Sequence, residues 1–230
     1  MRLAVIPARG GSKRIPHKNI VQFCGKPMIA YAIEAVRESG LFDKIHVSTD
    51  SKEICEVVEK LGVNIDFMRP TELADDFIGL APVLRWVLKK YQQQGEVFES
   101  LCCIMPNSPL LNSQDLIDAF DIFNQYNGQY PLLVFARLPV PAEWAFHRSK
   151  EGFMNAISPK SIEIRSQDLE DAYYECGPFH IWRPNHLEMT TPASGNVLSY
   201  VLPAERAVDI DTPEDLAFAE RLYRISGKEL

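Results

Sequence analysis

The sequence predicts a three-layer α/β/α fold in which helices cover both faces of a parallel sheet. Through the first half of the chain, short runs of β-branched and aliphatic residues alternate with segments whose apolar residues recur at helical spacing. That alternation is typical of βαβ units. The chain has 230 residues, 46% of them hydrophobic, so it can bury one substantial core. We therefore expect a single domain over residues 1–230.

The expected elements follow one another in a regular order. The predicted strands of the first half are short apolar runs at residues 3–6, 45–48, 63–68, 101–105 and 132–136. The predicted helices between them are residues 28–38, 52–61, 81–91 and 114–126. In such folds ligands bind at the carboxyl ends of the strands, so the loops that follow the strands are the first place to look for a site.

The alternation breaks down over residues 139–182, where prolines separate strand-like pieces such as 153–157 and 161–164. We interpret this stretch as an inserted antiparallel arm. The main pattern resumes with a strand at 197–202, and a helix over 213–224 closes the fold.

The loop after the first strand has the composition of a phosphate site. Residues 6–19 read IPARGGSKRIPHKN, in which Gly10 and Gly11 allow backbone N–H groups to approach an anion. The cations of the loop are Arg9, Lys13, Arg14 and Lys18, with Ser12 and Asn19 among them. Residues 1–33 contain six basic and no acidic residues in a chain of net charge -7. The spacing matches neither a Walker A loop nor a G-x-G-x-x-G fingerprint, so a third kind of phosphate loop is indicated.

Two carboxylates near the C-terminus suit a magnesium ion. Asp209 and Asp211 stand two residues apart, a spacing that directs both side chains to the same face of an extended chain. Mg²⁺ usually takes one or two carboxylates and completes its octahedron with water and substrate phosphates. The alternative is structural: Asp211 or Thr212 could cap the last helix, with Pro213 in its first turn.

Three further positions follow predicted strands and could contact a nucleotide. Arg69 could bind a phosphate or a base edge. It could instead pair with Asp75 or Asp76 and order its own loop. Asn107 and Ser108 lie between two prolines, where they could face a nucleoside or form a plain turn.

Composition argues against several other classes. A sequence pI of about 5.3 disfavours a nucleic-acid partner, which needs a broad basic face. The sequence contains no run of 18 apolar residues, so no membrane span is predicted. The apolar run before Pro7 is too short for a signal peptide. The five cysteines lack C-x-x-C pairing and the histidines lack ligand spacing, which indicates reduced thiols in a cytoplasmic protein without a zinc site.

Taken together, several of these segments resemble the CMP-N-acetylneuraminate synthetase family. The resemblance runs in order through PARGGSKRIPHKNI at 7–20, GKPM at 25–28, VSTD at 47–50, RP at 69–70 with LADD at 73–76, RSQDL at 165–169 and DIDTPED at 209–215. The strings at 23–28 and 165–169 are most similar to the pseudaminic acid cytidylyltransferase branch. Two segments depart from that branch: 105–109 is MPNSP, nearer the sialate type except for Met105, and 177–182 is GPFHIW where GQFYW is common.

The resemblance implies a Rossmann-like nucleotide-diphospho-sugar transferase fold, Mg²⁺ and a homodimer formed through the arm. It implies transfer of CMP from CTP to a nine-carbon ulosonic acid, for surface glycan or flagellin glycosylation, with pseudaminic acid favoured over N-acetylneuraminate or legionaminate. A non-catalytic nucleotide-binding homologue is the remaining alternative.

The resemblance also implies roles for individual residues. The nucleotide would be bound by Ala8, Arg9, Gly10, Gly11, Ser12, Lys13, Lys18, Asn19, Arg69, Asn107 and Ser108. Arg165, which is otherwise an ordinary exposed arginine, would bind the sugar carboxylate together with Ser166 and Gln167, and Phe179 and His180 would line the sugar pocket. Asp209 and Asp211 would bind the metal, with Lys18 and Arg9 stabilising the charge on the reacting phosphate. Asp211, or a metal-bound water that it orients, would remove the hydroxyl proton.

Overall fold

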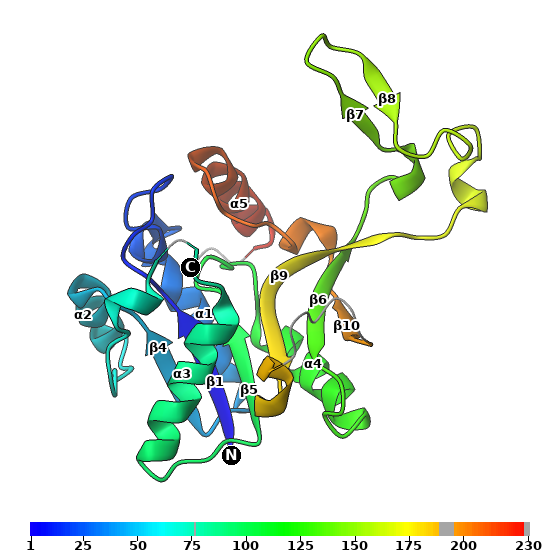
Figure 1. Cartoon of the computed structure of the whole chain (residues 1–230). Coiled ribbons are helices and arrows are strands. Elements are labelled where there is room, and N and C mark those ends of the chain that lie inside the picture. Colours follow the sequence, from blue (N-terminus) through cyan, green and yellow to red (C-terminus); the bar gives the residue numbers. More distant parts are fainter. Residues whose placement is uncertain (76, 189–195, 228–230) are drawn as a thin grey trace.

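In the computed structural model, which describes residues 1–75, 77–188 and 196–227, a mixed six-stranded sheet forms the centre of the molecule (Figure 1). Its strands, in chain order, are β1 (Arg2–Pro7), β4 (Lys44–Ser48), β5 (Ser100–Ile104), β6 (Leu132–Arg137), β9 (Tyr173–Trp182) and β10 (Leu198–Val201). Across the sheet their order is β10, β6, β9, β5, β1, β4. The α/β class is confirmed, but the sheet is not wholly parallel, because β9 runs antiparallel to both of its neighbours, β5 and β6.

In the described part of the chain, five α-helices pack around the sheet. They are α1 (Met28–Ser39), α2 (Lys52–Lys60), α3 (Leu80–Gln93), α4 (Ser113–Gln125) and α5 (Pro213–Ile225), each close to a predicted helix. Side chains alternate across β1: Ala4 and Ile6 join the core cluster under α1, α2 and α4, whereas Leu3 and Val5 pack with α3 on the opposite face. This alternation produces the three layers. In a third cluster, α5 packs against the short hairpin of β2 (Gln22–Phe23) and β3 (Lys26–Pro27).

Local signals at the helix ends explain several boundaries. The side chain of Ser51 accepts a hydrogen bond from the Ile54 backbone N–H at the start of α2. Asn112 and Asp115 form a capping box that starts α4. Gly40, with φ of 63°, ends α1 in the left-handed conformation that glycine adopts without steric cost.

Two predicted strands are wrong, and the arm differs from its prediction. Residues 63–68 form an irregular loop beyond β4, the edge strand of the sheet, and residues 161–164 form turns. The predicted piece at 153–157 contains β8 (Met154–Ala156), which pairs with a strand missed by the sequence analysis, β7 (Phe146–Arg148). The last ten residues of the predicted arm are β9, which lies inside the main sheet.

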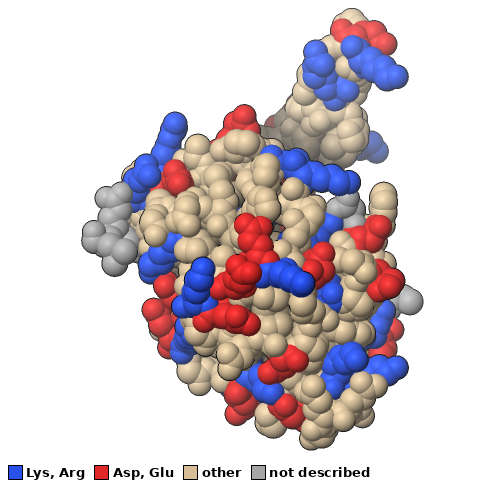
Figure 2. Space-filling model, turned by 90° about the vertical axis from the view of Figure 1, so that its left-hand side faces the viewer, with Lys and Arg blue, Asp and Glu red and all other residues tan. Residues whose placement is uncertain are grey.

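The arm leaves the end of β6 and returns into β9, and its β7–β8 hairpin projects far from the body (Figure 1). Its apolar side chains are unusually exposed: Phe153 has 72% of its surface accessible and Met154 has 58%. Figure 2 shows that the tip of the arm also carries charged side chains of both signs. Such a surface is typical of a segment that packs against another molecule. Among the described residues, no helix combines the length and hydropathy needed to cross a lipid bilayer.

Candidate active site

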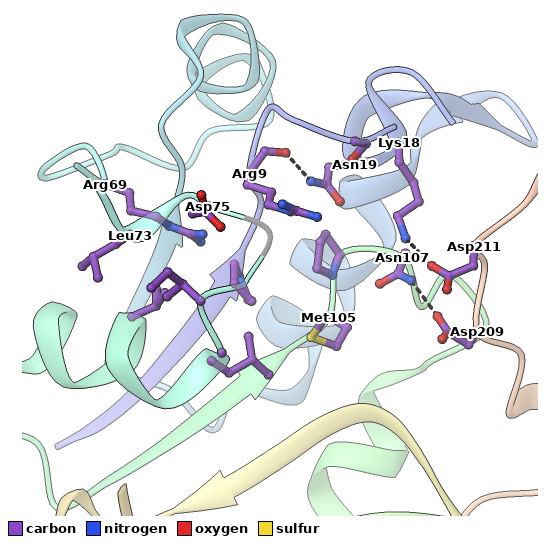
Figure 3. Close-up of a pocket in the computed structure, with 17 residues that line it drawn as sticks. Arg9, Lys18, Asn19, Arg69, Leu73, Asp75, Met105, Asn107, Asp209 and Asp211 are labelled. Atoms are coloured by element: carbon purple, nitrogen blue, oxygen red, sulfur yellow. Dashed lines mark hydrogen bonds and ion pairs between the residues drawn. The ribbon is translucent and has the colours of Figure 1, made fainter. Parts of the chain in front are cut away.

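A cavity of about 300 Å³ opens at the carboxyl ends of β1 and β5 (Figure 3). Four segments that are distant in sequence supply its lining: the loop after β1, the segment before α3, the loop after β5 and the segment before α5. Eight of the predicted residues line it, namely Arg9, Ser12, Lys18, Asn19, Arg69, Asn107, Asp209 and Asp211. A second cavity of about 310 Å³ shares Arg9, Ser12, Lys18 and Asp211 and adds Lys13 and Arg14. The cations of the loop after β1 and the carboxylates before α5 therefore lie around the same site.

The loop after β1 is held in place by its own backbone. The Ala8 N–H donates to the Ser48 carbonyl at 2.9 Å, and the Gly10 N–H donates to Asp50 Oδ1 at 2.9 Å. A Cβ on Gly10 would lie 3.0 Å from the Ser51 Cβ, so close packing explains this glycine. A Cβ on Gly11 would have no neighbour within 4 Å. Ala8 and Gly10 thus support the loop, and none of Ala8, Gly10 and Gly11 lines either cavity.

A short 3-10 helix at Lys18–Ile20 carries the next two predicted residues. It follows His17, whose left-handed backbone (φ of 54°) turns the chain back toward the loop. The buried Asn19 donates from Nδ2 to the Arg9 carbonyl at 2.9 Å and closes the loop. Lys18 points into the cavity, where Nζ donates to the Ile210 carbonyl at 3.0 Å and to Asp211 Oδ1 at 3.0 Å (Figure 3).

Asp211 lies between two cations of the phosphate loop. Besides the contact with Lys18, its Oδ2 lies 2.7 Å from Nη2 of Arg14, an exposed side chain. Partial burial alone would raise the pKa of Asp211, but the hydrogen bond and charge of Lys18, together with Arg14, lower it overall. Asp211 is therefore ionised at neutral pH and faces cations that could otherwise bind phosphate.

Asp209 has a different environment. Its Oδ1 accepts a hydrogen bond from Asn107 Nδ2 at 3.0 Å. Desolvation by the surrounding protein raises the pKa of Asp209, and the neighbouring Asp211 carboxylate raises it further, against the opposing effects of Lys18 and Asn107. Because the Asp211 carboxylate disfavours the charge of Asp209, a cation bound by both would stabilise the ionised form of Asp209.

The capping alternative is resolved by the start of α5. Thr212 and Asp215 form the capping box, and Pro213 occupies the first turn. The Asp211 side chain takes no part in that box and faces the cavity. Both aspartates are thus available to a ligand.

The chemistry of this donor set fits Mg²⁺. Two carboxylates beside an amide oxygen provide hard oxygen ligands for an ion that also retains water and substrate phosphates. Within residues 1–75, 77–188 and 196–227, no group of three or more His, Cys, Asp or Glu side chains could hold a metal ion by itself. A metal bound by Asp209 and Asp211 would consequently depend on the substrate for some of its ligands.

Arg69 lies deep in the cavity wall with 6% of its surface exposed. It is bound to β4 and not to Asp75: Nε donates to Ser48 Oγ at 3.1 Å and Nη2 donates to the Ser48 carbonyl at 2.7 Å. Asp76, the other acidic partner considered for Arg69, lies outside the described residues. Burial lowers the pKa of Arg69, while the nearby Asp50 opposes that effect.

The remaining predicted residues are not brought to the cavity of their own chain. Ser108 forms a turn, with its carbonyl accepting the Leu111 N–H. Arg165, Ser166 and Gln167 lie exposed at a 3-10 helix in the arm, where Arg165 Nε contacts Asp168 Oδ2 at 2.8 Å. Phe179 has no exposed surface and packs in the core, so its side chain cannot reach a ligand.

His180 occupies the opposite face of β9 from Phe179. Its Nε2 lies 2.8 Å from Glu175 Oε1, and its ring lies 5.0 Å from that of Trp182. Neither cavity is lined by His180.

Sequence reasoning missed part of the site. Asp75, Leu73, Ile78 and Met105 line the first cavity, and Asp50 supports the phosphate loop. Asp50 follows β4 directly, so its position at the carboxyl edge of the sheet was a usable signal. Leu73 and Ile78 come from the loop before α3. The sequence indicated that this loop starts at the carboxyl edge of the sheet, but it assigned a ligand contact only to Arg69.

Several known proteins are similar to this chain in sequence or in fold. Residues 3–226 match the sequence profile of the family described as cytidylyltransferase. The chain is 37% identical over 225 residues to a pseudaminic acid cytidylyltransferase of Campylobacter jejuni (strain 81-176), covering 97% of each chain. It is 31% identical to a CMP-N,N'-diacetyllegionaminic acid synthase of Legionella pneumophila (strain Philadelphia 1), covering 99% of this chain and 98% of that protein. Among solved structures, a CMP:2-keto-3-deoxy-manno-octonic acid synthetase complexed with CTP has the same fold, with a TM-score of 0.75 at 17% identity over 98% of this chain and 99% of that one.

Proposed function

Because this chain belongs to the cytidylyltransferase family and is therefore a nucleotidyltransferase, we propose that it couples CTP to a nine-carbon ulosonic acid, with pseudaminic acid as the favoured substrate. The products are a CMP-sugar and pyrophosphate. The observation that carries this proposal is the meeting of the phosphate-loop cations with Asp209 and Asp211 around one cavity. The choice of sugar rests on the higher identity to the pseudaminic acid enzyme than to the legionaminic acid enzyme. We place the reaction in the cytoplasm, where CTP is available.

The bond that forms joins the anomeric hydroxyl oxygen of the sugar acid to the α-phosphorus of CTP, and the bond that breaks releases pyrophosphate. Lys18 and Arg9 face the cavity, where they would neutralise charge on the phosphate oxygens as the nucleophile approaches. Ser12 and Lys13 would bind the rest of the triphosphate. Arg69 and Asn107 lie on two sides of the part of the first cavity that the triphosphate would leave free (Figure 3). We place the nucleoside there.

Asp209 and Asp211 would hold Mg²⁺, which when bound supplies positive charge to the phosphates and orients them. The chain's own contribution is the pair of hard oxygen ligands, with Asn107 fixing the orientation of Asp209 through its 3.0 Å hydrogen bond. A carboxylate with a lowered pKa is a weak base. Asp211 would therefore accept the proton of the sugar hydroxyl only once Lys18 and Arg14 have turned toward the triphosphate.

The proposed function predicts pyrophosphate release with CTP and an ulosonic acid. We expect turnover with pseudaminic acid to exceed that with legionaminic or N-acetylneuraminic acid, and CTP to exceed ATP, GTP and UTP. A coupled phosphate assay over this panel of sugars and nucleotides measures both preferences. Equal rates with ATP and CTP would overturn the nucleotide assignment, and the absence of release with every sugar acid would favour a non-catalytic homologue.

The arm leads us to propose a homodimer. The arm projects from the body of the molecule (Figure 1), it contains Arg165, which lines neither described cavity, and it exposes large apolar side chains, including Phe146 and Phe153. Burying these side chains against a second copy would stabilise the pair. In that arrangement Arg165, with Ser166 and Gln167, would serve the sugar site of the other copy, where its planar guanidinium could bind the sugar carboxylate.

Arg165→Ala should raise the KM for the sugar acid about tenfold or more and leave the KM for CTP nearly unchanged, because only the sugar would lose a charge-assisted hydrogen bond. Steady-state kinetics with each substrate varied in turn measures this asymmetry. Equal weakening of both substrates would assign Arg165 to the fold or to the dimer interface.

A mixing experiment tests whether the arm acts on the other copy. Arg165→Ala and Lys18→Met chains are mixed and allowed to exchange, and the rate is measured at a sugar concentration well below the KM of Arg165→Ala, where both variants are strongly impaired. Arms that act in trans would restore about one site in four, whereas arms that act in cis would restore none.

A further inference from the structure

The segment between α2 and Arg69 is held in place without a sheet ladder. Residues 63–68 pair with no strand, although they lead directly to a side chain that lines the cavity. The backbone N–H of Arg69 donates to the Thr49 carbonyl at 2.7 Å, so the segment returns to the end of β4 at this residue. Contacts from side chains must therefore determine where the rest of the segment lies.

Val63 and Ile65 pack with the core cluster that contains α1, and Asp66 and Phe67 make the contacts to β4 and α3. Asp66 Oδ2 accepts a hydrogen bond from the Tyr91 hydroxyl at 2.7 Å and lies 3.4 Å from Lys44 Nζ. The Phe67 ring lies 4.5 Å from that of His46 and 4.9 Å from that of Tyr91. The segment is thus attached to β4 through His46 and Lys44 and to α3 through Tyr91.

His46 completes a chain of hydrogen bonds that is buried at His46 and Tyr91 and reaches the surface at Asp66. His46 has no exposed surface, and its Nδ1 lies 3.0 Å from the Tyr91 hydroxyl oxygen. Because the one hydroxyl hydrogen of Tyr91 is donated to Asp66, His46 must donate from Nδ1. Nε2 of this neutral ring then carries no hydrogen. Among the described residues, that atom has no hydrogen-bond partner.

The surroundings keep His46 neutral. Burial lowers the pKa of His46 to about 4, and the nearby cations Arg69 and Lys44 lower it in the same direction against Asp66. A protonated ring would repel Arg69, and it would also place an unpaired N–H in the core. The ring therefore serves as a fixed hydrogen-bond donor over the whole physiological pH range.

A buried hydroxyl or ring N–H is costly unless it is paired, so the hydrogen bonds made by the Tyr91 hydroxyl and by His46 Nδ1 favour one arrangement of these side chains. Only three positions separate Asp66 from Arg69, and His46 shares a face of β4 with Ser48, the residue that binds the Arg69 guanidinium. The hydrogen-bond chain and Arg69 are consequently anchored to the same strand.

We propose that the hydrogen-bonded chain of His46, Tyr91 and Asp66 is a positioning device that holds Arg69 at one place in the nucleotide site. These residues touch no substrate and act only through Arg69. The inference rests on the proposed function, in which Arg69 contacts CTP.

Tyr91→Phe is the primary test, because it removes one hydroxyl and keeps the ring in place. We expect the Kd of CTP, measured by calorimetry without sugar, and the KM for CTP each to rise about tenfold. The KM for the sugar acid and kcat at saturating CTP should stay within about twofold of the parent values. His46→Asn should retain most of the CTP affinity, because its amide can donate where Nδ1 does, whereas His46→Ala should lose it.

Tyr200→Phe is a matched control at the opposite edge of the sheet. Its hydroxyl also donates to a carboxylate, Asp115, at 2.8 Å. Tyr200→Phe should lower the melting temperature about as much as Tyr91→Phe does, without a change in the affinity for CTP. Should Tyr91→Phe fail to fold, Asp66→Ala removes the acceptor at a partly exposed position and makes the same prediction.

Two results would overturn the inference. One is an unchanged Kd of CTP in Tyr91→Phe. The other is a rise in the KM of both substrates together with a fall in kcat, each of the same size as in Tyr200→Phe. Arg69→Lys is measured in parallel, and unchanged CTP binding in that variant would also overturn it. Pyrophosphate release by the parent protein tests the proposed function separately. The proposed function and the positioning role of the hydrogen-bonded chain can therefore fail independently.

Discussion

Asp209→Asn and Asp211→Asn should each reduce kcat by about a hundredfold or more while the protein stays folded. Each change removes a negative hard ligand and conserves the volume of the side chain. The capping box of α5 uses Thr212 and Asp215, so neither substitution removes a helix cap. Turnover over a range of Mg²⁺ concentrations measures the loss of catalysis, and thermal melting measures any loss of stability.

Asp118→Asn is the control for this pair. Asp118 lies on α4, where it accepts an exposed hydrogen bond from Gln114, and it lines neither cavity. We expect its rate and Mg²⁺ dependence to match those of the parent protein. A near-normal rate for Asp209→Asn or Asp211→Asn at low Mg²⁺ would remove that aspartate from the metal site.

Lys18→Met should lower kcat by about two to three orders of magnitude, with a smaller change in the KM for CTP. The reason is that Lys18 faces the proposed α-phosphate position, where charge increases as the transition state forms. The substitution also leaves Asp211 with Arg14 as its cationic partner and should raise the pKa of Asp211. Single-turnover measurements at saturating CTP isolate the chemical step.

Lys13→Met provides the comparison within the same loop. Lys13 lines only the second cavity, so its loss should weaken CTP binding more than it slows the chemistry. If both variants showed the same fall in kcat with unchanged KM, Lys18 would have no special relation to the reacting phosphate.

The helices and most strands could be predicted because their signals are local. In α2, the apolar residues Ile54, Val57 and Val58 recur on one face, and the side chain of Ser51 caps the first turn. The phosphate loop was equally local, since its glycines and cations are consecutive in the chain. Its position at the end of β1 follows from the βαβ order.

The failures at 63–68, 161–164 and β9 share a cause. A short apolar run can form a strand only if a partner is available along the sheet, and sequence does not report that partner. Residues 63–68 lie beyond the edge strand β4 and are held by side-chain hydrogen bonds and ring contacts to His46 and Tyr91. β9 was assigned to the arm because the strand–helix alternation breaks down before it. An antiparallel strand can join the sheet without a crossover helix, so the loss of alternation did not mean that β9 left the sheet.

The sequence by itself determined the α/β class, the phosphate loop and the acidic pair, because each depends on residues close together in the chain. Only the tertiary structure decided that Lys18 and Arg14 meet Asp211, that Thr212 caps α5, and that the arm points away from its own cavity. Lys18 and Asp211 are 193 positions apart, and their 3.0 Å contact exists because two loops end at the same edge of the sheet. Contacts of that kind depend on how the elements pack, and local sequence patterns carry no information about that packing.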